Sequence, residues 1–321
     1  MTAIRPPKAV QTYAAERSGP KSVSVAIPCY NEAVTIGKVV GDFRVALPNA
    51  TVYVIDNKSS DGSADLALEA GAEVIHENRQ GKGYVMQAIL ERMDCDALVV
   101  VDGDDTYSAE DVNQLVVPIL NGEADMVVGT RLEHATKASL RRLNYVGNRM
   151  ILLAVRLSFG TQLNDVLSGY RAFSRRFLER VPLLTTGFET ETELTIQALE
   201  HGLIIKEVPV TYRRRPQGSH SKLRPFGDGY QILLTVAVWL RDHRPLAVFG
   251  TAGLTCLLVV LVASTLRLLD YAGISTLPAS LLSGTLILMT IVGFMFIGLG
   301  LVLNSINVRF REMLCLLRRL G

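Results

Sequence analysis

The chain has 321 residues and a formal net charge of +2 at pH 7, from 33 Lys and Arg against 31 Asp and Glu. So small a charge gives no electrostatic footprint for nucleic acid, and no basic stripe alternates with aromatic residues along a strand. The four cysteines lie far apart, without a CxxC or Cys/His cluster, and therefore indicate neither a zinc site nor a disulfide framework. Residues 1–21 lack the apolar core of a signal peptide, and we expect a flexible tail there.

After this tail, short apolar runs alternate with segments of helical period. The runs predict strands at 23–27, 52–55, 73–75, 97–101 and 126–129, with helices at 33–46, 63–70 and 84–93. Strands that alternate with helices predict an α/β fold with a doubly wound, mostly parallel sheet. Ligands of such sheets bind beyond the carboxyl ends of the strands. We expect residues 22–225 to form this domain.

Three of the predicted strands end in polar clusters. The first strand leads into Pro28-Cys-Tyr-Asn-Glu32, the second into Asp56-Asn-Lys-Ser-Ser-Asp-Gly62, and the fourth into Asp102-Gly-Asp-Asp105. Acids after strands often only cap helices, and Asp61 is open to that interpretation. Three such clusters on one rim of a sheet are more than capping alone requires.

The two common phosphate-binding motifs are absent. The first strand is not followed by G-x-G-x-x-G, and Gln80-Gly-Lys-Gly83 has the wrong spacing for a P-loop. Phosphate charge then needs another partner. Asp102 and Asp104 offer hard carboxylate oxygens to Mg²⁺ or Mn²⁺ and leave coordination positions for diphosphate oxygens.

In this order and spacing the clusters resemble glycosyltransferase family 2 with the GT-A fold. The resemblance rests on Ile27-Pro-Cys-Tyr-Asn-Glu32, Asp56 to Gly62, Gln80 to Gly83, and Asp102-Gly-Asp104. Three further segments narrow it to the dolichyl- and polyprenyl-phosphate hexose synthases, whose bacterial members often append two membrane spans. These segments are Gly129-Thr-Arg131, Asp165-Val-Leu-Ser-Gly-Tyr-Arg-Ala-Phe173 and Gly187-Phe-Glu-Thr-Glu191. The additional Asp105 leaves open which pair of acids binds the metal.

The resemblance implies a donor site. The residues that would bind the nucleotide sugar are Pro28, Tyr30, Glu32, Asp56, Lys82, Asp102, Gly103 and Asp104. Among them, Asp102 and Asp104 would hold the metal and the diphosphate. Lys82 has the alternative interpretation of a solvated lysine in a turn.

The resemblance also implies an acceptor site. Its candidates for contact with the phosphate and the lipid are Arg131, Ser168, Arg171, Arg213 and Lys222. A planar, permanently charged guanidinium such as that of Arg131 suits a phosphate. Arg171 is equally well explained as a buried partner of Glu189 or Glu191. The segment of Arg213 resembles a mobile loop that closes over the substrates, and a membrane-surface patch is the alternative.

The implied reaction is the inverting transfer of a hexosyl group to polyprenyl phosphate, which gives a β-linked product. A phosphomonoester with a second pKa of about 6 is largely ionised near neutrality and needs no strong base. Asp165 is the candidate base by position, with an orienting or structural role as its alternative. A UDP-hexose or UDP-N-acetylhexosamine is favoured as donor, and GDP-mannose is the alternative.

Two other functions are alternatives to this one. A processive polysaccharide synthase shares the GT-A core, but it would need more spans and usually a Q-x-x-R-W motif. A non-catalytic nucleotide-sugar-binding membrane protein would not be expected to keep Asp56, Asp102 and Asp104, all of which are present.

Two long apolar segments follow the predicted domain, at about 246–267 and 277–303. Each exceeds the roughly 20 residues that cross about 30 Å of hydrocarbon as a helix. Basic residues flank their outer ends, so the positive-inside rule places the catalytic domain and both termini in the cytoplasm. We expect a transmembrane hairpin with a basic tail over 245–321.

Amphipathic segments are expected next to these spans. Arg142, Arg149 and Arg156 recur beside an apolar stripe, and residues 226–244 form a second, juxtamembrane segment. A basic edge beside an apolar face is typical of helices that lie in the membrane interface, in contact with lipids. A helix packed on the domain is the alternative for the first segment. The family resemblance also implies a homo-oligomer, either a dimer or a tetramer.

Overall fold

The computed structural model describes residues 21–131, 152–153, 155–156, 159–183, 190–216, 218, 238, 240–242, 244–271 and 282–320. The chain divides into two compact units. The first comprises residues 1–135 and 168–220, and the second comprises residues 136–167 and 221–321. The predicted tail over 1–21 lies outside the described residues except for Lys21, as does most of the predicted juxtamembrane segment over 226–244. Of the three arginines expected along the first amphipathic segment, only Arg156 is described.

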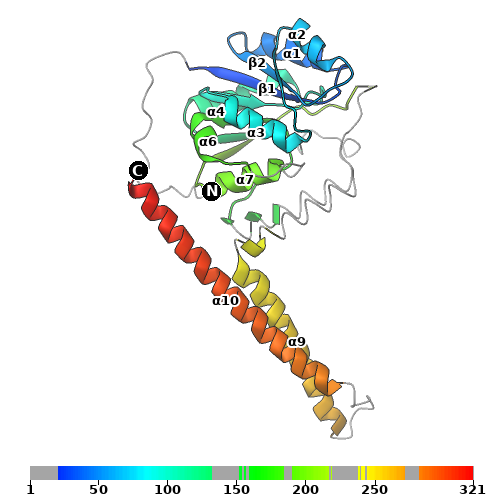
Figure 1. The fold of residues 1–321 in the computed structure, drawn as a ribbon, viewed down its shortest axis with the longest axis vertical. Coiled ribbons are helices and arrows are strands. Elements are labelled where there is room, and N and C mark those ends of the chain that lie inside the picture. Colours follow the sequence, from blue (N-terminus) through cyan, green and yellow to red (C-terminus); the bar gives the residue numbers. More distant parts are fainter. Residues whose placement is uncertain are drawn as a thin grey trace. The chain divides into compact units, whose positions relative to one another are not determined.

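A seven-stranded sheet forms the centre of the first unit, in the order β3-β2-β1-β4-β6-β5-β7 (Figure 1). The strands are β1 (Val23–Cys29), β2 (Thr51–Asp56), β3 (Glu73–His76), β4 (Ala97–Val100), β5 (Met126–Thr130), β6 (Arg171–Ser174) and β7 (Ile205–Pro209). Only β6 runs antiparallel to its neighbours, β4 and β5. The prediction of a mostly parallel α/β sheet is confirmed.

Helices cover both faces of this sheet. They are α1 (Ile36–Ala46), α2 (Ser63–Glu69), α3 (Lys82–Arg92), α4 (Val112–Leu120), α6 (Arg175–Arg180) and α7 (Thr190–Glu200). Because side chains alternate along a strand, β1 supplies Val25 and Ile27 to a core shared with α1 and α4. The intervening Ala26 faces the opposite core, which contains α3, α6 and α7. Apolar residues on both faces are what a parallel sheet between helices requires, and the central strands β4 and β5 are buried over their whole length.

The register of the sheet brings the polar clusters to one edge. Cys29 at the end of β1 pairs with Asp56 at the end of β2, and Asp56 pairs with His76 at the end of β3. The side chain of Asn57 then joins two loops, since it donates to the carbonyl of Arg79 at 2.8 Å and accepts from the amide of Gly81 at 2.8 Å. These bonds fix the start of α3 beside the ends of β1 and β2.

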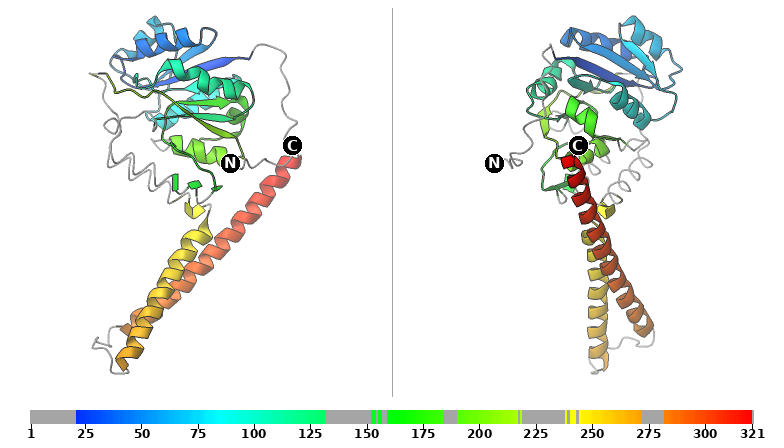
Figure 2. Two further views of the ribbon diagram at one scale, coloured as in Figure 1. Left: turned by 180° about the vertical axis from the view of Figure 1, so that it is seen from behind. Right: turned by 60° about the vertical axis from the view of Figure 1, so that its left-hand side comes forward.

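The second unit contains two long helices, α9 (Pro245–Tyr271) and α10 (Leu282–Leu320) (Figure 2). They pack antiparallel, because Gly253 meets Gly293 while Gly300 meets Phe249. A Cβ on Gly253 would lie 2.6 Å from the carbonyl oxygen of Gly293, so only glycine allows this approach. Close approach through small residues is common between membrane helices.

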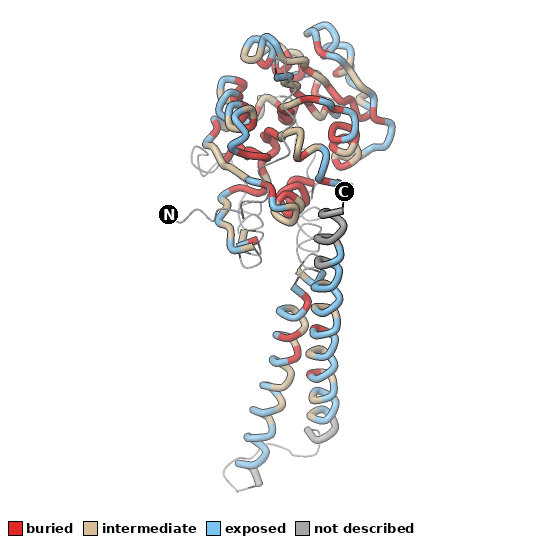
Figure 3. Tube along the Cα trace, turned by 90° about the vertical axis from the view of Figure 1, so that its left-hand side faces the viewer, coloured by how far each residue is buried: buried red, intermediate tan, exposed pale blue. Residues whose placement is uncertain are grey.

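The apolar parts of both helices are long enough to cross a bilayer. The most apolar 18-residue windows of Pro245–Leu269 and Thr285–Phe310 have mean hydropathies of 2.5 and 2.7. These windows are only 6% and 11% buried, as the exposed colouring in Figure 3 shows. Exposed apolar helices of this length suggest association with a membrane, and two such C-terminal helices were predicted from the sequence.

Candidate active site

The turn after β4 carries the acids Asp102 and Asp104 around Gly103. Asp104 is only 3% exposed, and its Oδ1 accepts from the amide of Thr106 at 3.1 Å and from its hydroxyl at 2.5 Å. The hydroxyl of Thr35 donates to the carbonyl of Gly103 at 2.7 Å. A Cβ on Gly103 would lie 3.2 Å from Ile27, so the turn packs tightly against β1. The two carboxylates are therefore held in a fixed turn.

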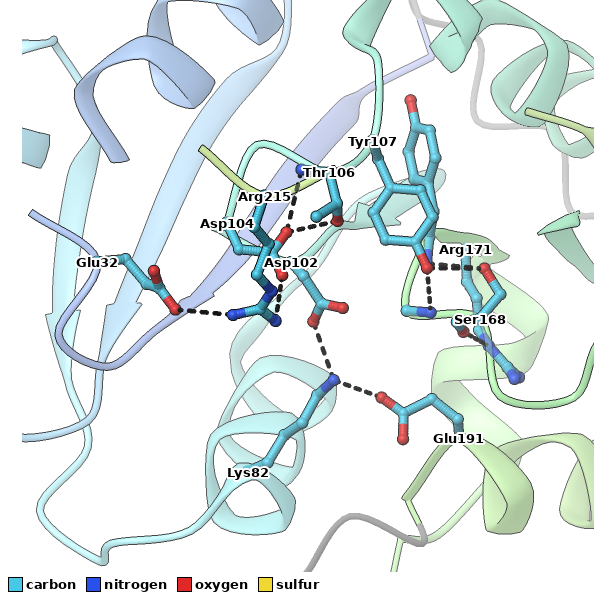
Figure 4. A network of polar contacts seen from close by, with 12 residues as sticks. Glu32, Lys82, Asp102, Asp104, Thr106, Tyr107, Ser168, Arg171, Glu191 and Arg215 are labelled. Carbon is cyan, nitrogen blue, oxygen red and sulfur yellow. Dashed lines mark hydrogen bonds and ion pairs between the residues drawn. The ribbon is translucent and has the colours of Figure 1, made fainter. Parts of the chain in front are cut away.

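Two positively charged side chains from distant parts of the sequence form ion pairs with these acids (Figure 4). The ammonium of Lys82, at the start of α3, lies 2.9 Å from Asp102 Oδ1 and 2.5 Å from Glu191 Oε1. The guanidinium of Arg215 forms an ion pair with Asp104 and lies 4.0 Å from Glu32 Oε1. Four carboxylates from three separate segments of the chain are thus paired with these two positively charged side chains.

The burial of this cluster changes its protonation equilibria. Burial alone would raise the pKa of Asp102, but the charge and hydrogen bond of Lys82, together with the charges of Arg215 and Arg131, outweigh it and hold that pKa below the ordinary value. Burial opposes the charged form of Lys82, yet Asp102 and Glu191 together raise its pKa. Burial first and the charge of Asp102 second raise the pKa of Asp104. Asp102 is therefore an ionised carboxylate at neutral pH, paired with a charged lysine.

The predicted nucleoside residues lie at the neighbouring strand ends. Asp56 is buried; it accepts from the amide of Ser59 at 3.3 Å, and its Oδ2 lies 3.3 Å from Nδ1 of His76. Tyr30 is exposed, and Pro28 is half-buried in β1. The carboxylate of Asp61 accepts from the amides of Ala33 and Ser63, and the residue that caps α2 is Gly62, so Asp61 joins two loops and is not the helix cap.

Cys29 lies between Pro28 and Tyr30, which are predicted to contact the nucleoside, and its thiol is buried. It is 2% exposed, and burial raises its pKa to about 12, with the hydroxyl of Ser63 opposing and the charge of Asp56 adding to the rise. Since the thiolate is the nucleophile, we expect iodoacetamide at pH 8 to leave Cys29 of the native protein unlabelled and to label it after denaturation. Mass spectrometry of the peptide that contains Cys29 measures this. Native labelling as fast as that of the denatured chain would contradict the assignment.

The predicted acceptor residues have different surroundings. The guanidinium of Arg131 lies 5.7 Å from the ring centroid of Tyr212, and Arg213 donates to Ser108 Oγ at 3.3 Å. Ser168 is fully buried, and its hydroxyl donates to the carbonyl of Gly129 at 2.6 Å. Lys222 lies outside the described residues. The acceptor roles of all these residues stay predictions.

Arg171 is a buried arginine that bonds to its own unit. It is 2% exposed, and it donates to the carbonyl of Ser168 and to the hydroxyl of Thr195, both at 2.9 Å. Of the two predicted acidic partners, Glu191 contacts Lys82, and Glu189 lies outside the described residues. These contacts are those of a structural residue, and a role in binding phosphate stays a prediction.

Asp165, the candidate base, belongs to the second unit. It is 1% exposed, and its Oδ1 accepts from the amide of Leu167 at 3.1 Å. A carboxylate that accepts from the amide two residues further on stabilises the local turn of the chain. The roles of Asp165 as a base or as an orienting residue stay predictions.

Three members of the cluster were not predicted as site residues. Glu191 and Arg215 supply contacts to Lys82 and Asp104, and Gly169 packs against the carboxylate of Asp102. Glu191 and Gly169 belong to motifs that carried the family resemblance, and Arg215 belongs to the basic segment that was expected to close over the substrates. Their segments, although not their contacts, were therefore visible in the sequence.

The donor set fits a divalent cation that is shared with a substrate. Among the described residues, no group of three or more His, Cys, Asp or Glu side chains gathers to enclose a metal. Mg²⁺ commonly binds one or two carboxylates together with substrate phosphates, and Asp102 and Asp104 offer two carboxylates on one turn. These are the residues that would hold the ion, with the diphosphate completing its shell.

A mostly parallel α/β sheet with paired acids after β4 and a polar loop after β1 is typical of glycosyltransferases of the GT-A type. The chain belongs to glycosyl transferase family 2, whose family model matches residues 24–181. It is 38% identical over 235 residues to glycosyltransferase AglJ of Haloferax volcanii, which covers 73% of this chain and 77% of that protein. The recognition from sequence is confirmed.

Two further comparisons refine the family assignment. The chain is 31% identical over 211 residues to a dolichyl-phosphate hexose transferase of Haloferax volcanii, covering 65% of this chain and 90% of that protein. It also resembles a crystal structure of glucosyl-3-phosphoglycerate synthase from Mycobacterium tuberculosis in complex with Mn²⁺, UDP-glucose and phosphoglyceric acid. That likeness has a TM-score of 0.55 at 25% identity and covers 67% of this chain and 79% of the other.

Proposed function

We propose that this protein transfers a hexosyl group from a nucleotide-diphosphate sugar to polyprenyl phosphate at the cytoplasmic face of a membrane. The observation that carries the proposal is the pair of the half-buried Asp102 and the buried Asp104, which face Lys82 and Arg215 in a chain that also has two bilayer-length helices. A soluble acceptor would not require such helices. The similarity to a dolichyl-phosphate hexose transferase supports a lipid phosphate as the acceptor.

The donor is held at the ends of the first, second and fourth strands. Pro28, Tyr30 and Asp56 line the nucleoside pocket, and Asp56 accepts hydrogen bonds from the base or the ribose. Asp102 and Asp104 hold Mg²⁺ or Mn²⁺, which when bound neutralises charge on the departing nucleoside diphosphate. The solved relative with Mn²⁺ and UDP-glucose supports a nucleotide-diphosphate sugar as the donor, and a UDP-sugar is our first choice.

The acceptor phosphate is held by arginine. Arg131 binds and orients it through a planar fork of donors, which also offsets the repulsion between the two phosphate groups. The phosphate oxygen attacks the anomeric carbon from the face opposite the leaving group. One displacement inverts the anomeric centre, so an α-linked donor gives a β-linked product, with Asp165 orienting the acceptor or accepting a proton.

The two apolar helices hold the enzyme at its substrate. Arg241 and Arg244 precede α9, and Arg309 lies at the end of the apolar part of α10. Near the connection between the two helices, α9 carries only Arg267. Basic residues remain on the cytoplasmic side of a membrane. Both termini are therefore cytoplasmic, and the protein crosses the membrane twice. Assembly into a homo-oligomer through these helices is part of the same proposal.

Transfer of radiolabel from nucleotide sugars to extractable lipid tests this function. The full chain in membranes with polyprenyl phosphate is offered UDP-glucose, UDP-N-acetylglucosamine and GDP-mannose in turn, with and without Mn²⁺. We expect one of the UDP-sugars to give an organic-soluble, singly glycosylated product whose β linkage is visible by NMR. Label in a long polymer would indicate the processive synthase. Binding of the nucleotide sugar without transfer from any donor would indicate the non-catalytic alternative.

A further inference from the structure

A short strap, residues 211–215, crosses the acids of the candidate site. The amide of Thr211 donates to Asp111 Oδ2 at 2.7 Å, and the amide of Arg213 donates to the carbonyl of Thr106 at 2.8 Å. Between them Tyr212 forms a β-bridge with Tyr107, with ring centroids 5.2 Å apart. The strap is therefore hydrogen-bonded to the segment that follows Asp104. This attachment places the side chain of Arg215 beside the acids.

Arg215 completes the bonding of Asp104. The Oδ1 of this carboxylate already accepts both bonds from Thr106, and its Oδ2 is the atom that pairs with Arg215. The same guanidinium reaches Glu32, with 4.0 Å between the two charged groups. As Figure 4 shows, Arg215 lies between two acids that come from different loops. Both oxygens of Asp104 are therefore engaged in this state.

A divalent cation on Asp104 needs the oxygen that Arg215 holds. A free cation would have to separate this ion pair and leave the guanidinium without its main acceptor. A cation that arrives together with a nucleoside diphosphate brings phosphate oxygens, which are strong acceptors for a displaced guanidinium. The exchange then replaces the ion pair of Arg215 with Asp104 by one with the diphosphate, whereas binding of the free ion loses that pair without a replacement.

We infer that Arg215 is a specificity-determining residue that makes the acid pair select a metal–diphosphate complex over the free metal ion. It occupies the cation position on Asp104 until a diphosphate offers it a replacement partner. The inference rests on the proposed metal-dependent transfer, because it assigns the acid pair to a metal. It concerns the order and selectivity of loading, which the transfer reaction by itself does not define.

Binding of Mn²⁺ to the full-length protein in detergent, followed by the EPR signal of free Mn²⁺, tests the inference without an activity readout. Wild type, Arg215→Gln and Arg215→Ala are compared without nucleotide and with saturating UDP or GDP. Arg214→Gln is the matched control, since it removes an exposed arginine from the same strap. Asp104→Asn, combined with Arg215→Gln, establishes that the measured ion is bound at Asp104.

Without nucleotide, we expect both Arg215 variants to bind Mn²⁺ about 10- to 100-fold more tightly than wild type, the range of one charge-assisted hydrogen bond. Arg214→Gln should match wild type, and Asp104→Asn should remove the gain. The enhancement of Mn²⁺ binding by nucleotide should shrink in both Arg215 variants.

The outcomes separate this inference from the proposed function. If wild type binds Mn²⁺ with nucleotide but the Arg215 variants bind free Mn²⁺ no better than wild type, Arg215 is only a structural clamp and the inference is wrong. If wild type binds no Mn²⁺ even with nucleotide, the metal-dependent function itself fails. Equal gains in Arg214→Gln would show a general effect of strap charge and would also overturn the role of Arg215.

Discussion

Replacing Asp102 or Asp104 with asparagine is expected to lower kcat/KM for hexosyl transfer at least about 1000-fold, equivalent to ~4 kcal/mol of transition-state stabilisation. Each substitution keeps the size of the side chain and removes its negative charge. The amide that replaces the Asp102 carboxylate would still lie near Lys82 but could not hold a divalent cation as a carboxylate does. Radiolabel in extracted lipid, measured at saturating Mn²⁺, gives the rate.

Asp105→Asn is the matched control for these substitutions, because it removes a charge from the next position of the same turn. Asp105 pairs with Lys38 at 2.8 Å, whereas its neighbour Asp104 pairs with Arg215. Its φ of 57° is left-handed, a conformation that asparagine adopts readily. We expect this variant to keep most of the activity. Equal losses in Asp105→Asn and Asp104→Asn would contradict the assignment of the metal-binding pair.

This comparison addresses an ambiguity that the sequence could not resolve. Three acids within four residues permit more than one metal-binding pair, and a motif carries no information about side-chain direction. The direction depends on the turn: the left-handed backbone at Asp105 accompanies a carboxylate that faces Lys38 of α1, while Asp104 faces Arg215. The two acids thus have different partners, and the assignment of the metal to Asp102 and Asp104 stays a prediction.

The fold was largely predictable where strands are apolar and helices follow them. All five strands predicted from apolar runs are present, and α3 begins at Lys82, two residues earlier than predicted. The strands β6 and β7 were not predicted. β6 is four residues long and begins with the charged Arg171, and most of β7 is only half-buried. Their place in the sheet depends on pairing with β4 and β5, which no local pattern contains.

The candidate site was predictable as a set of strand ends but not as a set of contacts. Position after a strand was enough to bring Asp56, Asp102 and Asp104 to one edge. The partners Glu191 and Arg215 come from much later in the chain, and their pairing follows from α7 and from the strap that is bonded to Thr106. Such contacts are set by tertiary packing, so a charged residue in a motif could be recognised while its partner could not.

Gly169→Ala is expected to lower kcat/KM about 100-fold, or ~2.7 kcal/mol, because of a single added methyl group. A Cβ at this position would overlap the carboxylate of Asp102. Gly169 is not among the described glycines with a positive φ, so space and not backbone conformation is the reason for glycine here. The carboxylate of Asp102 must move away from its place beside Lys82, which displaces the metal-binding oxygen.

Two comparisons separate this effect from a general loss of stability, since overpacking alone costs typically about 1–3 kcal/mol. Gly41→Ala in α1 adds the same methyl group where no atom lies within 4 Å, and it should leave activity unchanged and stabilise the helix slightly. The double variant Gly169→Ala with Asp102→Asn should be no less active than Asp102→Asn alone, because both changes remove the same carboxylate function. Additive losses in the double variant, or full activity of Gly169→Ala at a temperature where it is folded, would mean that Gly169 does not act through Asp102.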